Sequence, residues 1–149
     1  MRVEKNFKEF IALLNRNNVR YLIIGGFAYS FYAEPRFTKD IDIFIELSKE
    51  NAEKIIKTIK DFGFIDVGLT EKDFLKTDQI IQLGVAPLRI DIATSIKGIV
   101  EFQNAWKNRV IGRYGDTKVY FISKEDLIKN KQALGRKQDL ADIENLERI

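Results

Sequence analysis

Apolar residues recur along the first part of the chain with two different periods. Between residues 7 and 14 they return every three or four positions, which predicts an amphipathic helix. The run 19–24 is apolar and rich in β-branched residues, and the glycine pair 25–26 follows it directly. That composition predicts a strand buried on both faces, then a turn, and then a short helix over 27–32.

Isoleucine alternates with aspartate and phenylalanine over 40–46, which is typical of a strand. Pro35 and its polar neighbours predict a loop before that strand. Apolar residues at helical spacing predict a helix over 48–62, with Gly63 as its stop. The segment 64–78 shows no clear period. These elements predict a β-α-β-α pass.

The second half of the chain predicts further strands and helices. Apolar runs bounded by glycine-containing turns indicate strands, whereas capping residues before apolar residues at helical spacing indicate helices. The expected strands are 80–83, 88–93, 110–114 and 118–122, with a turn at 84–87 and a hairpin turn at Gly115 and Asp116. The expected helices are one around 102–106 and two at the C-terminus, before and after Gly135.

The composition indicates one folded domain over 1–149. A chain of 149 residues can bury one sizeable core, and only two prolines argue against disordered linkers. No apolar run reaches the length of a membrane span, and the charged start 1–5 lacks the apolar core of a signal peptide. We therefore expect a cytoplasmic protein without membrane contact.

The absence of cysteine and histidine narrows the chemistry. It excludes disulfides, zinc sites with these ligands, cysteine nucleophiles and histidine acid–base catalysis. Catalysis would therefore use carboxylates, Lys, Arg, Ser, Thr or Tyr. The net charge of +3 is compatible with a polyanionic partner but does not demonstrate one.

Asp40 and Asp42 lie at positions i and i+2 of a predicted strand, so their carboxylates project from one face. Hard cations such as magnesium prefer carboxylate and phosphate oxygens, so the pair suits a metal site. Gly25 and Gly26, between a strand and a helix, would present backbone N–H groups to a phosphate. Together these residues favour nucleotide chemistry.

Asp91 is the natural third carboxylate. It lies mid-strand between two isoleucines, where an unpaired buried charge would be costly. If the strand 88–93 lies beside the strand 40–46, Asp91 would face the same metals and could accept a proton from an attacking hydroxyl. In the alternative interpretation the glycines form an ordinary turn, the aspartates are solvated, and Asp91 pairs with Arg89 or Lys97.

In this order, these residues resemble the nucleotidyltransferase superfamily with the DNA polymerase β-type fold. The resemblance implies an α+β fold with a mixed central sheet flanked by helices and a helical C-terminus. It also implies an enzyme of EC 2.7.7 type that transfers a nucleoside monophosphate from an NTP to an acceptor hydroxyl and releases pyrophosphate. By match, Asp40, Asp42 and Asp91 would hold two Mg²⁺ ions, while Gly25 and Gly26 would bind the nucleotide.

The loop 35–39 and the run 131–142 make the chain similar to small stand-alone prokaryotic members related to AbiEii-type toxins. That narrower resemblance implies nucleotide-binding roles for four more residues. They are Arg36, Thr38, Lys131 and Asp139. In the alternative interpretation the arginine is solvated and the helical residues form ordinary surface ion pairs.

The acceptor stays open at the level of sequence. An RNA such as a tRNA end, a protein side chain and a small molecule all offer a hydroxyl, and a cognate toxin or antitoxin is a further expected partner. AbiEii-type toxins are longer, and antitoxin-like relatives usually carry Gly-Ser where this chain has Gly25-Gly26. A second hypothesis is therefore a non-catalytic module that keeps the fold and binds a nucleotide or a partner protein.

Overall fold

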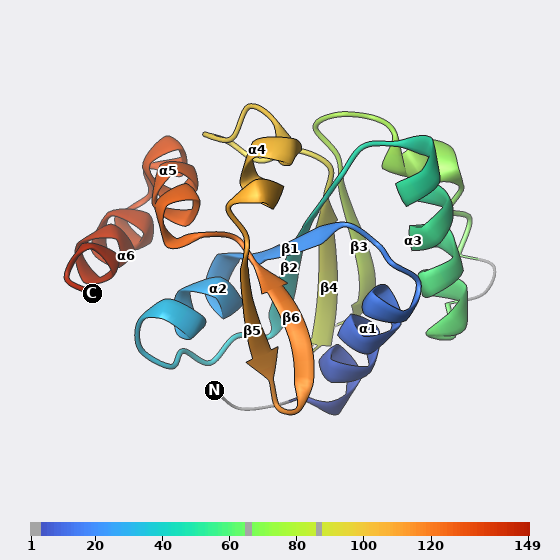
Figure 1. The fold of residues 1–149 in the computed structure, drawn as a ribbon, viewed down its shortest axis with the longest axis horizontal. Coiled ribbons are helices and arrows are strands. Elements are labelled where there is room, and N and C mark those ends of the chain that lie inside the picture. Colours follow the sequence, from blue (N-terminus) through green and yellow to red (C-terminus); the bar gives the residue numbers. More distant parts are fainter. Residues whose placement is uncertain (1–3, 65–66, 86–87) are drawn as a thin grey trace.

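The computed structural model describes residues 4–64, 67–85 and 88–149, and its strands form one six-stranded mixed sheet (Figure 1). The strand order is β3-β4-β2-β1-β6-β5. The strand bounds are β1 Tyr21–Ile24, β2 Asp40–Ile45, β3 Ile80–Val85, β4 Leu88–Ala93, β5 Val110–Tyr114 and β6 Thr117–Phe121.

Helices flank this sheet, which confirms the α+β fold. In Figure 1, α1 and α3 lie to the right of the strands, whereas α2, α5 and α6 lie to the left. The bounds are α1 Lys5–Arg16, α2 Gly25–Tyr32, α3 Lys49–Asp61, the 3-10 helix η1 Glu71–Phe74, α4 Phe102–Lys107, α5 Lys124–Leu134 and α6 Lys137–Glu147.

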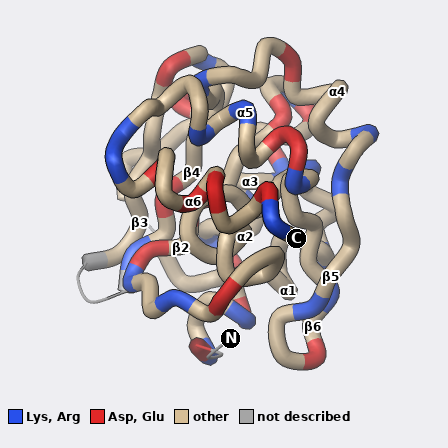
Figure 2. Tube along the Cα trace, turned by 90° about the vertical axis from the view of Figure 1, so that its left-hand side faces the viewer, with Lys and Arg blue, Asp and Glu red and all other residues tan. Residues whose placement is uncertain are grey.

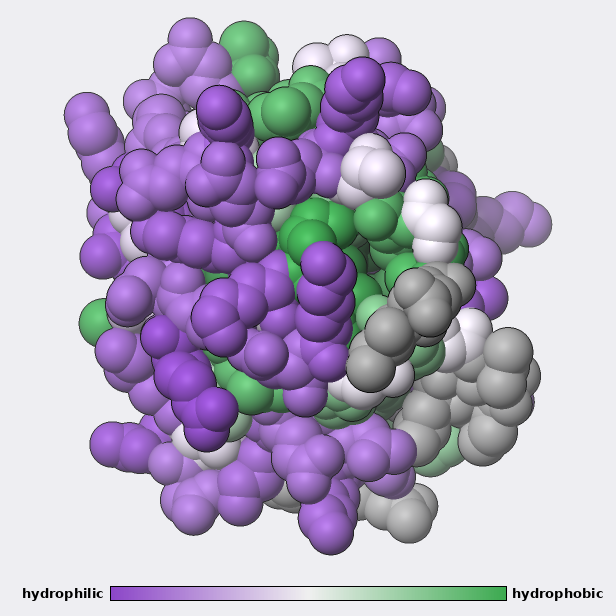
Figure 3. Space-filling view, turned by 90° about the vertical axis from the view of Figure 1, so that its right-hand side faces the viewer, coloured by the Kyte–Doolittle hydropathy of each residue, from purple (hydrophilic) through white to green (hydrophobic). Residues whose placement is uncertain are grey.

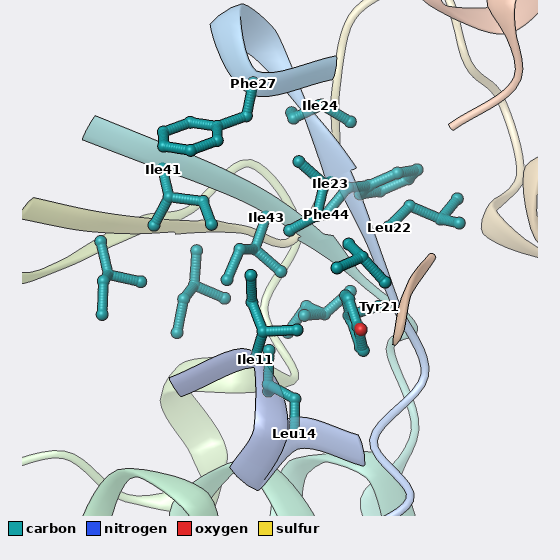
Figure 4. Close-up of a cluster of buried hydrophobic side chains, with 14 of the residues drawn as sticks. Ile11, Leu14, Tyr21, Leu22, Ile23, Ile24, Phe27, Ile41, Ile43 and Phe44 are labelled. Atoms are coloured by element: carbon teal, nitrogen blue, oxygen red, sulfur yellow. The ribbon is translucent and has the colours of Figure 1, made fainter. Parts of the chain in front are cut away.

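The alternation along β2 separates an apolar face from a polar one. Ile41 and Ile43 are buried, and Figure 4 shows them on the side of the strand where Ile11 and Leu14 project from α1. Successive side chains of a strand point to opposite faces. The aspartates of β2 therefore lie on the face away from α1, where they stay half-buried.

Strand β2 lies between β1, which is antiparallel to it, and β4, which is parallel. In this register Asp42 is opposite Ile24 on one side and opposite Asp91 on the other. The adjacency of the strands 40–46 and 88–93, on which the third carboxylate depended, is therefore present. β5 and β6 form the expected antiparallel hairpin.

The structure moves several expected boundaries. β1 begins at Tyr21 instead of residue 19, because Asn18 has a φ of 56° and the Val19 N–H donates to the Leu14 carbonyl, which closes α1. Helix α2 begins at Gly25 instead of residue 27, so both glycines belong to its first turn. β3 extends to Val85 instead of ending at residue 83, so Gly84 and Val85 of the expected turn belong to the strand, and residues 86–87 lie outside the described residues.

The α3 side of the molecule shows apolar surface in its middle between hydrophilic side chains (Figure 3). A cavity of about 290 Å³ lies on the α3 side, and Ile56, Ile59 and Leu69 are among its lining residues. Within the described part of the chain, no helix is both long and apolar enough to cross a membrane.

Candidate active site

Three carboxylates and one guanidinium share the polar face of the sheet. The β2–β4 register places Asp40 opposite Arg89 and Asp42 opposite Asp91, so all four side chains project from the same face. The Asp91 side chain is 12% exposed and the Asp40 side chain 37%, so the cluster opens to solvent at its Asp40 end. The structure thus brings the three predicted carboxylates onto adjacent strands.

Gly25 is required by its surroundings. Its φ is +66°, and a Cβ atom at this position would fall within contact distance of the Asp42 carboxylate. The first turn of α2 therefore lies directly against Asp42 because residue 25 has no side chain. A Cβ atom on Gly26 would lie 3.5 Å from the nearest Thr38 atoms, which is ordinary contact.

Thr38 connects the preceding loop to both parts of the site. Its hydroxyl donates to the Asp40 carbonyl oxygen over 2.9 Å, and its side chain lies beside Gly26. Residues 38, 26 and 40 therefore form one packed corner where α2 meets β2. The structure places Thr38 as a brace within that corner, and its predicted contact with a nucleotide stays a prediction.

The environment of Asp42 disfavours its negative charge. Burial is the largest cause, and the nearby charges of Asp91 and Asp40 add to it, so the pKa of Asp42 rises from 3.8 to about 6. The positive charges of Arg89 and Arg136 oppose this shift but do not cancel it. A carboxylate crowded in this way gains from any added cation.

Arg89 supplies one cation already. Its Nη2 donates to Asp40 Oδ2 over 2.8 Å, and its Nε donates to Asp91 Oδ1 over 3.0 Å. The pairing of Asp91 with Arg89, considered as an alternative from the sequence, is therefore present. The bridge to Asp40 was missed, and its only signal in the sequence is the Arg-x-Asp spacing on a strand that pairs with Asp-x-Asp.

The donor chemistry suits magnesium, although the geometry is not ready-made. Carboxylate oxygens are the ligands that magnesium prefers, and burial together with the charges of Asp91 and Asp40 raises the pKa of Asp42. Among the described residues, however, no three acidic side chains converge closely enough to hold a metal ion. The three carboxylates offer the oxygen ligands that magnesium prefers, and in this structure Arg89 binds two of them, Asp40 and Asp91.

The other predicted residues meet in an ion-pair network around two buried aspartates, here called the helical network. It consists of Arg36, Lys131, Arg136, Asp139 and Asp142. Asp142, 1% exposed, accepts from both nitrogens of the Arg36 fork and from Lys131 Nζ over 2.8 Å. Lys131 also lies 3.7 Å from Asp139.

Opposing effects act on Asp142. Burial alone would raise its pKa, but the hydrogen bonds from Arg36, Lys131 and Gln138 outweigh burial and lower the pKa to about 2. The Arg36 guanidinium also lies 4.0 Å from the centre of the Tyr29 ring on α2. The helical network therefore joins α5 and α6 to α2 and to the loop before β2.

The helical network differs from the surface ion pairs of the alternative interpretation. Lys131 and Asp139 are buried, so they do not form surface ion pairs. The guanidinium of Arg36 binds Asp142 through two of its nitrogens. The sequence did not indicate this role of Asp142, although Asp142 belongs to the run 131–142 named above. The nucleotide-binding roles of Arg36, Lys131 and Asp139 stay predictions.

Arg136 connects the helical network to the carboxylates. Its Nε donates to Asp139 Oδ2 over 2.7 Å, its side chain is 70% exposed, and its charge acts on Asp42. Figure 2, which looks onto α6, shows acidic and basic stretches mixed across this side of the molecule. An exposed cation thus lies within electrostatic reach of the carboxylate face.

Comparisons with known proteins agree with this arrangement. Residues 2–148 match the model of a family described as "Nucleotidyltransferase of unknown function (DUF6036)". No curated protein matches the chain. The narrower resemblance to AbiEii-type toxins is not confirmed by these comparisons and stays a prediction.

Solved nucleotidyltransferases share the fold. The lincosamide antibiotic adenylyltransferase LnuA, solved with lincomycin bound, superposes with a TM-score of 0.62 at 23% identity over 97% of this chain and 96% of its own. The antibiotic-resistance factor ANT(2'')-Ia superposes with a TM-score of 0.62 at 12% identity, over 95% of this chain and 80% of its own. An antigenic nucleotidyltransferase-like protein from Paracoccidioides brasiliensis superposes with a TM-score of 0.56 at 16% identity, over 97% of this chain and 76% of its own. At such identities the likeness concerns the fold alone.

Proposed function

The chain belongs to the DUF6036 family of nucleotidyltransferases, and on that premise we propose that it is a magnesium-dependent enzyme that transfers a nucleoside monophosphate from an NTP to a hydroxyl group of a small molecule. The observation that carries this proposal is the alignment of Asp40, Asp42 and Asp91 on one face of adjacent strands, against the first turn of α2. Carboxylates so placed suit metal-assisted phosphoryl chemistry.

Each group has a distinct task in this reaction. Asp40, Asp42 and Asp91 would hold the magnesium, which when bound neutralises the triphosphate and polarises its α-phosphate. The backbone N–H groups of Gly25 and Gly26 point from the positive end of α2 and would bind the phosphate tail. The protein thereby positions the reactants and stabilises charge.

The transfer step balances with the chain's own groups. The acceptor oxygen forms a bond to the α-phosphorus while the bond from that phosphorus to the bridging oxygen breaks, and pyrophosphate leaves. The hydroxyl proton passes to the Asp91 carboxylate, which lies beside Asp42 in the sheet register. The products are a nucleotidylated acceptor and pyrophosphate.

A cavity on the same face supports a small acceptor. Phe44 lies two residues beyond Asp42, and it lines a cavity of about 280 Å³ together with Thr94, Phe102 and Gln103. Aromatic and polar walls of this size suit a hydroxylated small molecule. The fold is also that of LnuA, a lincosamide antibiotic adenylyltransferase, and of the antibiotic-resistance factor ANT(2'')-Ia. The mixed charges in Figure 2 offer no broad basic area for RNA on that side.

The first prediction concerns Asp42→Asn. We expect this variant to lose transfer by at least about a thousandfold, because it removes a metal-binding charge where the transition state needs it. The measurement incubates the protein with each labelled NTP, magnesium and separate pools of lincosamides, aminoglycosides, total RNA and lysate protein. Asp61→Asn, which alters an exposed ion pair with Lys57, is the matched control and keeps full labelling.

The labelled pool decides between acceptors. Label on RNA or on a lysate protein would replace the small-molecule acceptor, and label on a toxin would support the toxin–antitoxin setting. Unchanged labelling by Asp42→Asn would contradict the assignment. No labelling of any pool, with NTP binding retained, would favour the non-catalytic module, for which the Arg89 bridge between Asp40 and Asp91 is the supporting observation.

A further inference from the structure

We propose that Arg89 is a resident counter-ion of the metal site: it holds Asp40 and Asp91 closed in the free protein and yields them only when metal arrives together with a triphosphate. Arg89 has this role only if the chain is the metal-dependent transferase proposed above. The direct consequence is that metal alone binds weakly, whereas metal and triphosphate bind with positive coupling.

The contacts of Arg89 occupy the oxygens that a metal would need. Nη2 of Arg89 donates to Asp40 Oδ2 and also to Asp91 Oδ2 over 3.3 Å. Nε of Arg89 donates to Asp91 Oδ1. Both oxygens of Asp91 are therefore engaged by one guanidinium. A metal at these oxygens would compete with the bridge, because Arg89 places its positive charge and its N–H groups where the metal would approach.

The bridge is built so that it can open. The Arg89 side chain is 37% exposed, and so is that of Asp40, which places this part of the bridge at the solvent boundary. Ion pairs at such positions contribute little net stability, so the guanidinium can leave without disturbing the strand that carries it. β4 keeps its register through backbone pairing on both of its sides.

The triphosphate gives the displaced guanidinium a new partner. The planar fork of arginine binds phosphate oxygens through two parallel hydrogen bonds. A metal ion that arrives without phosphate gives the displaced guanidinium no such partner. A metal ion alone must break the bridge without compensation, whereas a metal–triphosphate complex breaks it and replaces it. Affinities for metal and triphosphate then rise together by the same factor, as linkage requires.

The test measures Mn²⁺ affinity from the electron paramagnetic resonance signal of free Mn²⁺, with and without inorganic tripolyphosphate. Without tripolyphosphate, Arg89→Gln is expected to bind Mn²⁺ about five- to tenfold more tightly than the wild type, because the competing cation is gone. Arg89→Lys keeps a cation but no fork, so its affinity should lie between the two. With tripolyphosphate the advantage of Arg89→Gln should disappear.

Arg20→Gln is the matched control. Arg20 also pairs with a carboxylate at a strand end, Glu46, but at the opposite end of β2, so its loss should leave Mn²⁺ affinity unchanged. Equal Mn²⁺ affinity of Arg89→Gln, Arg89→Lys and the wild type would overturn the role of Arg89 while leaving the labelling result intact. Absence of Mn²⁺ binding in all variants would overturn this role and the metal-dependent function together.

Discussion

Residue 25 lies so close to the Asp42 carboxylate that only glycine fits there. The positive φ of residue 25 and the carboxylate beside its Cα both demand glycine, whereas Gly26 has room for a side chain. The sequence marked both glycines equally, because a pattern of two glycines after a strand carries no information on what lies beside each. Only the register of β1 on β2 separates their roles.

This difference gives a prediction about stability. Gly25→Ala should destabilise the protein by about 2 kcal/mol, because alanine is strained at this φ and its methyl group meets the Asp42 carboxylate. Gly26→Ala, with its nearest side-chain neighbour at 3.5 Å, should change stability by less than about 1 kcal/mol. Urea unfolding of both variants measures this. Equal losses would contradict the packing described for residue 25.

Asp42 carries a second prediction, in which loss of activity accompanies a gain in stability. Its pKa in the folded protein, about 6, lies above the value of 3.8 for an unperturbed aspartate. The folded state therefore binds the proton more tightly, so stability is fully present below pH 3.8 and falls as the pH rises through 6. Asparagine cannot ionise and escapes that loss.

We therefore expect Asp42→Asn to be more stable than the wild type by about 2 kcal/mol at pH 7.5, and equal to it near pH 4. Urea denaturation at the two pH values, without metal, measures the difference. A variant that is less stable than the wild type at pH 7.5 would show that the charge of Asp42 is not unfavourable in the free protein.

At the scale of elements, the C-terminal helix pair is fixed by charge as well as by apolar packing. Gly135, at a φ of 65°, ends α5 and lets α6 turn back onto it. The sequence predicted both helices and the glycine between them. It could not predict that their charged residues are buried, because helical spacing is the same for an internal ion pair and for a solvated one.

Asp142 gives the prediction at this scale. Asp142→Asn should destabilise the protein by about 3 kcal/mol at pH 7, because it removes the common anion of the buried Lys131 and the partly buried Arg36. The pKa of Asp142 is lowered to about 2, so its contribution is present above about pH 4 and is lost as the pH falls toward 2. The difference from the wild type should shrink across that range.

Urea unfolding at pH 7 and pH 3 tests this. Asp61→Asn serves as the control, because its i,i+4 pair with Lys57 is solvent-exposed and should leave no measurable effect. If Asp142→Asn and Asp61→Asn behaved alike, the helical network would have no structural role, and its charges would be free for a nucleotide.

At the scale of the whole molecule, local patterns predicted the elements and the resemblance predicted the fold. Alternation over β2, the apolar run of β1 and the caps of the helices are all encoded within a few residues. The convergence of Asp91 on Asp42 is not, because parallel pairing of β2 with β4 joins segments about fifty residues apart. The Arg89 bridge follows from that pairing and was missed for the same reason.

The contact between Arg36 and Asp142 spans 106 residues of sequence. During synthesis, β1, α2 and β2 emerge long before α6, so the ion pair between Arg36 and Asp142 forms only after α6 has been made. A chain without α6 therefore has β2 without the ion pair that holds the loop before it. A chain cleaved between α5 and α6 would keep Asp40, Asp42 and Asp91 but would lose the carboxylate that binds the Arg36 guanidinium.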